Sequence, residues 1–244
     1  PGAVLFRLYD TYGLPLDLTA DIARERGLTI DRVGFDKEME RQRKLSKAAS
    51  QFVAATRVDL SDELATEFVG YKALKQAAAP ILNLLANNKS SVGELSEGEE
   101  GFIILAKTPF YAQGGGQIGD TGYLLNATSQ FLVTQTFKEG AFILHQGKLL
   151  KGHLKKGDKL KAEVDVEKRR AITLNHSATH LLHAALREVL GGHVMQKGSL
   201  VEPERLRFDY SHPDLLSTKQ LKIIEDRVNQ QIRANLPVLT QIMS

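Results

Sequence analysis

The sequence predicts an α+β fold made of N-terminal helices, a small antiparallel β-barrel and a second α+β module. Three observations support this prediction. Residues 1–58 are rich in strong helix formers, residues 59–166 consist of short strand-like segments between turns, and residues 167–244 return to a helical period around two short strands. We take these three ranges as the expected domains.

The first range is expected to hold helices that end at glycine or proline. The segment VLFRLYDTYG is apolar-rich and ends at Gly13, and Pro15 follows closely, which is a common way for a helix to end. The stretch GFDKEMERQRKLSKAASQF is rich in residues of high helix propensity. Helices are therefore expected up to about residue 52.

The second range is expected to form the barrel. Its segments GFIILAK, QFLVTQTF, AFILHQ and KLKAEVDV are short and rich in β-branched or aromatic residues. They are separated by turn-forming stretches such as SEGEEG, NATSQ and KKGD. Short strands with turns this frequent are typical of a small barrel.

The helical period returns at Asp165, at the border of the third range, and the predicted helix runs to the pair Gly191 and Gly192. HVMQKGSLV and ERLRFDYS are then predicted to be strands on either side of the turn VEPE. Ser217 with Gln220 resembles a capping box for a last helix, which Pro237 would break. PVLTQIM is a candidate for one further strand.

The composition is that of an ordinary globular protein. The 244 residues are 42% hydrophobic and include no cysteine, so disulfides and thiolate metal ligands from this chain are excluded. No apolar run is long enough to span a membrane, and no signal peptide is expected. The chain begins at Pro1 rather than at methionine, so we expect it to be a piece of a longer protein.

The charge pattern favours a polyanionic partner only modestly. The net charge is +3, but KEMERQRKLSK at 37–47 and KGHLKKGDKLKAEVDVEKRR at 151–170 are both basic. Either run alone is typical of a solvated face, and it is the presence of both that points toward a nucleic acid.

A stripe of histidines lies on the helix of the third range. His176 and His180 are one helical turn apart and can both reach one metal ion. His183 lies about 10.5 Å from His176 along the axis, which is too far to share that ion. Ser177 stands where a His-Glu-x-x-His metalloprotease keeps its general base. The pair is either half of a metal site or a solvated helix face, and the pattern alone leaves both open.

A glycine-rich segment, YAQGGGQIGDTGYLL, occupies residues 111–125. Gly114, Gly116 and Gly119 satisfy G-x-G-x-x-G, but a strand rather than a helix is expected next, so we reject a dinucleotide site. Two interpretations remain. The segment is a tight turn between strands, or its backbone closely approaches a substrate and presents Gln117. Three consecutive glycines favour the second interpretation slightly.

The two strands after the histidine helix carry further polar residues. Their alternation can place Gln196, Ser199, Arg207 and Asp209 in one region. Such residues are more often ordinary solvent-facing strand positions, so the residues alone favour no site here.

Several motifs, taken in order, resemble those of alanyl-tRNA synthetase over nearly the whole chain. They are LYDTYGLPLDLT, TPFYAQGGGQIGD, RRAITLNHSATHLLHAALREVLG, QKGSL and LRFDYSH. The opening motif resembles the link between the tRNA-recognition helices and the editing domain. One departure is that the family usually reads Ser-Gly-Gly-Gln where this chain has Gly114 to Gln117.

The resemblance implies an editing module that hydrolyses seryl- and glycyl-tRNA(Ala), with the acceptor end of tRNA(Ala) as partner and neither DNA nor membrane. It implies zinc held by His176 and His180 and by a later Cys-x-x-x-His, which would lie beyond Ser244. It also implies editing-site roles for Thr179, Gln196 and Gln117. ATP and Mg would bind a missing N-terminal domain of the cytoplasmic parent ligase. The alternatives are a non-catalytic tRNA-binding module and a free-standing deacylase.

Overall fold

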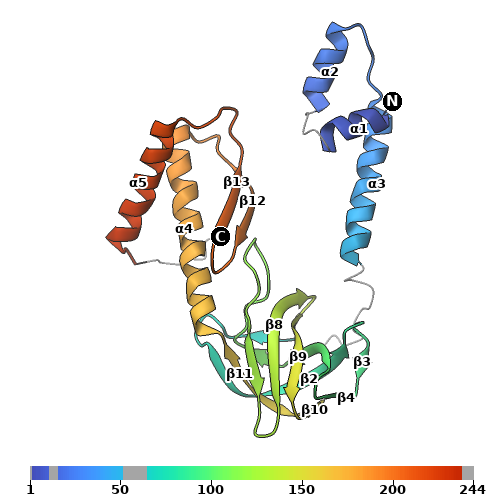
Figure 1. The fold of residues 1–244 in the computed structure, drawn as a ribbon, viewed down its shortest axis with the longest axis vertical. Coiled ribbons are helices and arrows are strands. Elements are labelled where there is room, and N and C mark those ends of the chain that lie inside the picture. The colour runs from blue at the N-terminus through green and yellow to red at the C-terminus, as the bar shows by residue number, and fades with distance from the viewer. Residues whose placement is uncertain (1, 11–15, 52–64, 238–244) are drawn as a thin grey trace. The chain divides into compact units, whose positions relative to one another are not determined.

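The computed structural model describes residues 2–10, 16–51 and 65–237, and its ribbon is shown in Figure 1. The chain divides into two compact units, Pro1–Arg57 and Val58–Ser244, which are described separately below. The α+β prediction is confirmed, because helices precede and follow a strand-rich region along the sequence. Among the described residues, no helix is both long and apolar enough to cross a membrane.

The first unit contains α1 (Gly2–Asp10), α2 (Leu16–Glu25) and α3 (Arg32–Gln51). Leu5 of α1 and Phe35 of α3 are buried. The Asp31 carboxylate accepts hydrogen bonds from the Gly34 and Gly2 amides, at 2.8 and 3.0 Å, and these bonds lower its pKa. They also connect α1, which contains Gly2, to α3, which contains Gly34. The expected stop at Gly13 and Pro15 lies outside the described residues.

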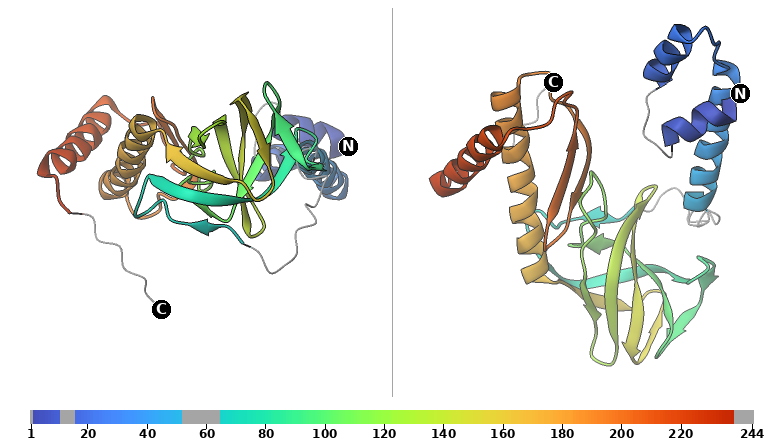
Figure 2. Two further views of the ribbon diagram at one scale, coloured as in Figure 1. Left: turned by 90° about the horizontal axis from the view of Figure 1, so that it is seen from below. Right: turned by 45° about the horizontal axis from the view of Figure 1, so that its top comes forward.

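In the described part of the second unit, eleven strands precede α4. The strands are β1 (Glu67–Phe68), β2 (Lys75–Ala86), β3 (Ser91–Val92), β4 (Glu94–Ser96), β5 (Glu100–Leu105), β6 (Lys107–Thr108), β7 (Gly122–Leu125), β8 (Gln130–Glu139), β9 (Phe142–Lys151), β10 (His153–Lys155) and β11 (Lys159–Val164). Figure 2 shows from two further directions how these strands curve.

Six of these strands close into the predicted barrel. They are hydrogen-bonded antiparallel in the order β11-β7-β8-β9-β5-β2, and β2 pairs with β11 to complete the circle. Closure leaves these strands without an unpaired edge. Inward-facing apolar side chains such as Leu84, Phe110 and Phe131 form one buried core. That burial is what stabilises the barrel.

The helix after the barrel starts almost without a linker. Only Asp165 separates β11 from α4 (Val166–Leu190), and its carboxylate accepts a hydrogen bond from the Lys168 amide as an N-cap. Gly191 ends the helix at positive φ, as the glycine pair predicts. The direction of α4 is therefore set by the last barrel strand.

The predicted hairpin and last helix pack against α4. They are β12 (Gln196–Val201), β13 (Leu206–Tyr210) and α5 (Thr218–Ala234), and they share a small apolar cluster with α4 (Figure 1). The capping box of Ser217 and Gln220 is confirmed. The helix ends at Asn235 in the left-handed conformation, before Pro237 is reached. Except for Pro237, the candidate strand PVLTQIM lies outside the described residues.

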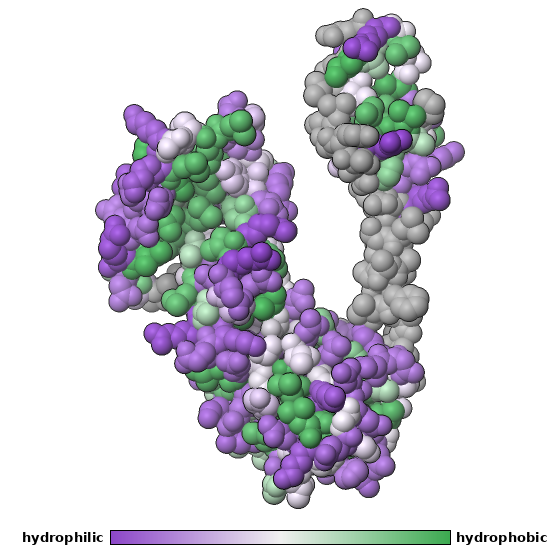
Figure 3. Space-filling view, in the orientation of Figure 1, coloured by the Kyte–Doolittle hydropathy of each residue, from purple (hydrophilic) through white to green (hydrophobic). Residues whose placement is uncertain are grey.

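The face of α4 that packs on its neighbours includes part of the histidine side. Ile172 and Thr179 are buried, although both project close to the histidines on the helix. Leu174, on the opposite side, is 63% exposed. Figure 3 shows apolar residues gathered along α4 and α5. The histidine stripe is thus a border between the packed face and solvent.

Candidate functional site

An ion pair fastens α4 to the barrel. Arg169 donates from Nε to both carboxylate oxygens of Asp120, at 2.8 and 3.0 Å, and its Nη2 makes a further contact with the same group. The guanidinium also donates to the carbonyls of Gly70 and Pro109, and Asp120 accepts from the Tyr111 amide. The pair is nearly buried and almost fully hydrogen-bonded, which is the condition under which a buried pair is tolerated.

The glycine-rich segment folds into a tight loop that docks on β12. The amide and carbonyl of Gly114 and of Gln117 bond to each other at 3.1 and 3.0 Å. Val201 of β12 donates its amide to the Gly116 carbonyl, and the Ile118 amide donates to the Val201 carbonyl. As expected, a strand follows the loop, so no helix N-terminus is presented to a phosphate.

The glycines serve two different purposes. A Cβ on Gly116 would lie 2.2 Å from Ser199 Oγ, and one on Gly119 would lie 2.2 Å from the Thr136 carbonyl oxygen. Both positions therefore allow close approach to the protein's own strands. At Gly115, which has a φ of +60°, no atom lies within 4 Å of an added Cβ. The tip of the loop at Gly115 is therefore open to a ligand.

The loop brings Gln117 to the histidine pair. Gln117 Oε1 lies 2.6 Å from His176 Nδ1, and the rings of His176 and His180 stack with centroids 5.1 Å apart. The amide oxygen can only accept, so Nδ1 carries a proton, and in the neutral ring Nε2 therefore keeps its lone pair. Partial burial lowers the pKa of His176, and the neighbouring His180 lowers it further. The lowered pKa favours the neutral imidazole, in which one nitrogen is free to act as a ligand or base.

The other expected site residues lie close by but make different contacts. The Thr179 hydroxyl is buried and donates to the Asn175 carbonyl at 2.8 Å within α4. Gln196 is exposed, and its amide donates to Ser199 Oγ at 3.1 Å. Ser199 in turn contacts the Gly115 carbonyl at 3.4 Å. Gln196 is thus joined to the glycine loop through one hydroxyl.

The remaining polar strand residues and histidines are not gathered here. Arg207 and Asp209 pair with each other at 3.2 Å on the surface, as the ordinary strand interpretation expects. His183 packs against the Phe208 ring, and His193 lies 3.0 Å from His212. Among residues 2–10, 16–51 and 65–237, no three histidines or acidic side chains come together around a possible metal ion.

The sequence did not single out three residues that position this site. Asn175 donates to the carbonyls of Glu202 and Pro203 at 2.7 and 3.1 Å, and so holds the β12–β13 turn against α4. Asp120 and Arg169 hold the base of the helix. Asn175 could have been found from the sequence, because it is a polar residue directly before His176.

The amino-acid sequence of this chain matches a known class of proteins. The family model described as tRNA synthetases class II (A) matches residues 1–168, and the chain belongs to this family. It is 53% identical over 244 residues to an alanine–tRNA ligase of Nitrosococcus oceani, covering 100% of this chain and 28% of that protein.

Two further alanine–tRNA ligases show similar identity. The match to that of Pseudomonas fluorescens is 53% over 241 residues, covering 99% of this chain and 27% of the relative. The match to that of Coxiella burnetii is 52% over 246 residues, covering 100% of this chain and 28% of the relative. The chain spans little more than a quarter of the length of these curated relatives.

Proposed function

We propose that this chain is part of an alanine–tRNA ligase and carries the site that hydrolyses seryl- and glycyl-tRNA(Ala). The parent would attach alanine to tRNA(Ala) with ATP and Mg, as the names of the relatives suggest. One observation carries the editing assignment. The contact of 2.6 Å between Gln117 and His176 joins the glycine loop to the histidine pair, although 59 positions separate them in the sequence.

A second, hydrolytic site is needed because binding energy alone cannot separate alanine well enough from glycine and serine. A pocket for alanine cannot strongly exclude glycine, because one methyl group is worth only ~1–3 kcal/mol. It also rejects serine poorly, since serine adds only a hydroxyl. Polar groups that bond this hydroxyl favour serine over alanine at the second site, because alanine would leave them unpaired. Thr179 and Gln196 are proposed for this role.

The residues of the site divide the work of ester hydrolysis. Gln117 fixes the tautomer of His176, so that Nε2 faces the reaction with its lone pair. The exposed tip at Gly115 lets the ester linkage of the acceptor end approach the backbone closely. Without zinc, a water held between Nε2 and the ester carbon is the nucleophile, and His176 takes its proton and passes it to the leaving ribose oxygen. With zinc bound, the same lone pair would instead hold the metal.

The two histidines also fit half of a tetrahedral zinc site. A neutral imidazole whose other nitrogen is hydrogen-bonded is the usual form of a histidine ligand, and His176 has this form. His180, stacked beside it, would be the second ligand. When bound, zinc supplies a Lewis acid. The described residues offer no third histidine or acidic ligand, so the other two positions need donors from elsewhere.

Hydrolysis of Ser-tRNA(Ala) tests the proposal. We would measure serine release with and without zinc, for this chain and for a form extended through the expected Cys-x-x-x-His. His176→Ala is expected to slow release about 100-fold, as loss of a positioned acid–base group does. The matched control is His153→Ala, which alters an exposed histidine on β10.

The possible outcomes separate the candidate functions. If the extended form releases no serine, the editing assignment is wrong. RNA binding that falls steeply with salt and is never followed by turnover would instead indicate a non-catalytic tRNA-binding module.

A further inference from the structure

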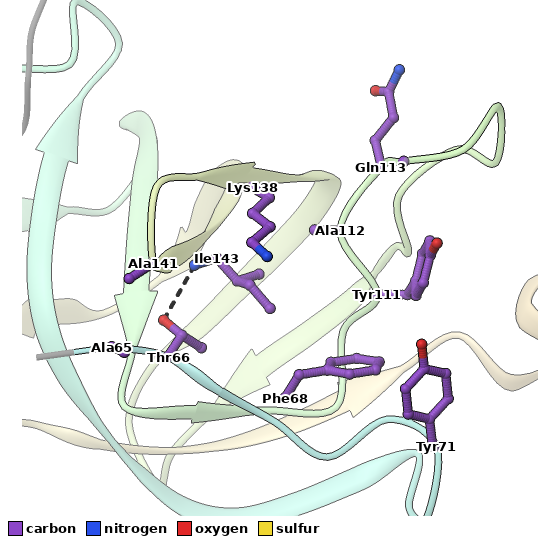
Figure 4. Close-up of a pocket in the computed structure, with 11 residues that line it drawn as sticks. Ala65, Thr66, Phe68, Tyr71, Tyr111, Ala112, Gln113, Lys138, Ala141 and Ile143 are labelled. Carbon is purple, nitrogen blue, oxygen red and sulfur yellow. Dashed lines mark hydrogen bonds between the residues drawn. The ribbon is translucent and has the colours of Figure 1, made fainter. Parts of the chain in front are cut away.

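A cavity opens on the barrel beside the glycine loop. Its volume is about 500 Å³, within the range of ligand-binding pockets. Figure 4 shows that the side chains of Phe68, Tyr71 and Tyr111 form one wall, while Lys138 points into the space near Ile143. Neither the aromatic wall nor Lys138 has a part in the proposed hydrolysis.

The aromatic wall is built to hold a flat ring. The Phe68 ring meets Tyr71 and Tyr111 edge to face, with centroids 5.0 and 6.0 Å apart. Tyr71 is nevertheless 85% exposed, so most of its ring surface is open to a ligand. Because this exposed ring belongs to a cluster of three aromatic side chains beside a cavity, it offers a ligand a surface for stacking.

The charge in the cavity favours an anion. Lys138 brings an ammonium group to it, and none of the described lining residues is acidic. Burial raises the pKa of Tyr111, so its phenol stays protonated and can donate a hydrogen bond. Aromatic faces combined with a cation are the usual elements of single-stranded nucleic acid sites, where bases stack and phosphates meet lysine.

The cavity also adjoins the proposed hydrolytic site. Gly114 lines the cavity and is hydrogen-bonded in both directions to Gln117, whose side chain reaches His176. We infer that this cavity binds an unpaired nucleobase of the tRNA acceptor strand, which stacks on the aromatic wall while a neighbouring phosphate lies at Lys138. This inference rests on the proposed function. The strand would cross the glycine loop between the two sites.

Binding of uncharged RNA tests this inference without hydrolysis. The probes are an RNA hairpin with a short single-stranded 3′ end and the same hairpin with a blunt end. Binding of each probe to the full 244-residue chain is measured by fluorescence anisotropy. Tyr71→Ala is expected to weaken binding of the single-stranded end about tenfold, while Tyr71→Phe keeps it. Lys138→Met should lower the salt slope of log Kd by roughly one.

Matched controls come from the same barrel. Tyr123→Ala on β7 and Lys148→Met on β9 remove an exposed tyrosine and an exposed lysine that do not line the cavity, and both should bind like the unaltered chain. The inference is overturned if Tyr71→Ala binds both hairpins normally or weakens both equally. It is also overturned if AMP alone binds the cavity more tightly than the hairpin does, since the ligand would then be a free nucleotide.

The two proposals fail in different ways. If His176→Ala leaves serine release unchanged but Tyr71→Ala weakens the single-stranded hairpin, the hydrolytic assignment fails and the base-binding cavity stands. The reverse pattern removes the cavity assignment and leaves the editing site intact.

Discussion

The histidine inside the barrel should make the second unit acid-sensitive. His145 on β9 is fully buried, and its Nδ1 donates to the Ile103 carbonyl at 2.9 Å. Thr108 Oγ1 lies 2.7 Å from Nε2 and donates to it, while the Phe110 amide donates to the same hydroxyl. Burial lowers the pKa of His145 to about 4. The ring is therefore a neutral member of a satisfied hydrogen-bond network, and its partners are a hydroxyl and a carbonyl rather than a carboxylate.

The magnitude follows from linkage between protonation and folding. The unfolded chain takes up a proton near the ordinary histidine pKa of 6.5, while the folded chain resists it down to about 4. Between these values the unfolded state binds more protons, so stability falls as pH falls. The slope approaches about 1.4 kcal/mol per pH unit, and the full effect is about 3 kcal/mol.

Urea unfolding followed by circular dichroism at a series of pH values between 7 and about 4.5 measures this effect. His145→Gln retains one donor and one acceptor but does not titrate, so its stability should fall less steeply over this range. Other groups titrate equally in both proteins, and the difference between the two curves isolates the histidine. Identical pH slopes for the two proteins would refute the reasoning.

Three further predictions concern the ion pair at the start of α4, the glycine loop and the capping box of α5. Arg169→Met should cost about 3–5 kcal/mol in urea unfolding, because it leaves a buried carboxylate unpaired, whereas Arg170→Met at the next, exposed position should be nearly neutral. Gly116→Ala should push the loop off β12 and so abolish serine release. Gly115→Ala, also at positive φ but facing open space, should cost about 1–2 kcal/mol of stability, and it should slow release because its Cβ enters the space left for the ester. Ser217→Ala should cost about 1 kcal/mol by removing the capping box of α5, and an unchanged urea midpoint would contradict this.

The sequence predicted those features that depend on nearby residues. Strand segments, the glycine pair after α4 and the capping box at Ser217 all follow from patterns within a few positions, and the structure contains each. The barrel followed from the same local signals, because short strands at frequent turns leave few other arrangements.

The features that the sequence missed depend on contacts between distant positions. Asp120 and Arg169 are 49 positions apart, and Asn175 bonds a turn 27 and 28 positions away, so neither partner is visible in a local window. The expected close approach of glycine to a substrate was assigned too broadly, since Gly116 and Gly119 face the protein's own strands. The proposed roles of His176, His180, Thr179, Gln196 and Gln117 stay predictions until hydrolysis is measured.

The single residue between β11 and α4 has a consequence for how this protein can tolerate change. An α-helix turns by about 100° for each residue, so one amino acid inserted beside Asp165 would rotate the helix by more than a quarter turn relative to the barrel. The imidazole that meets the glutamine amide would then face elsewhere, although every residue of the motif were still present. Length variation at this junction should therefore be far more damaging than variation at the outer hairpin between β2 and β3, where added residues enter solvent.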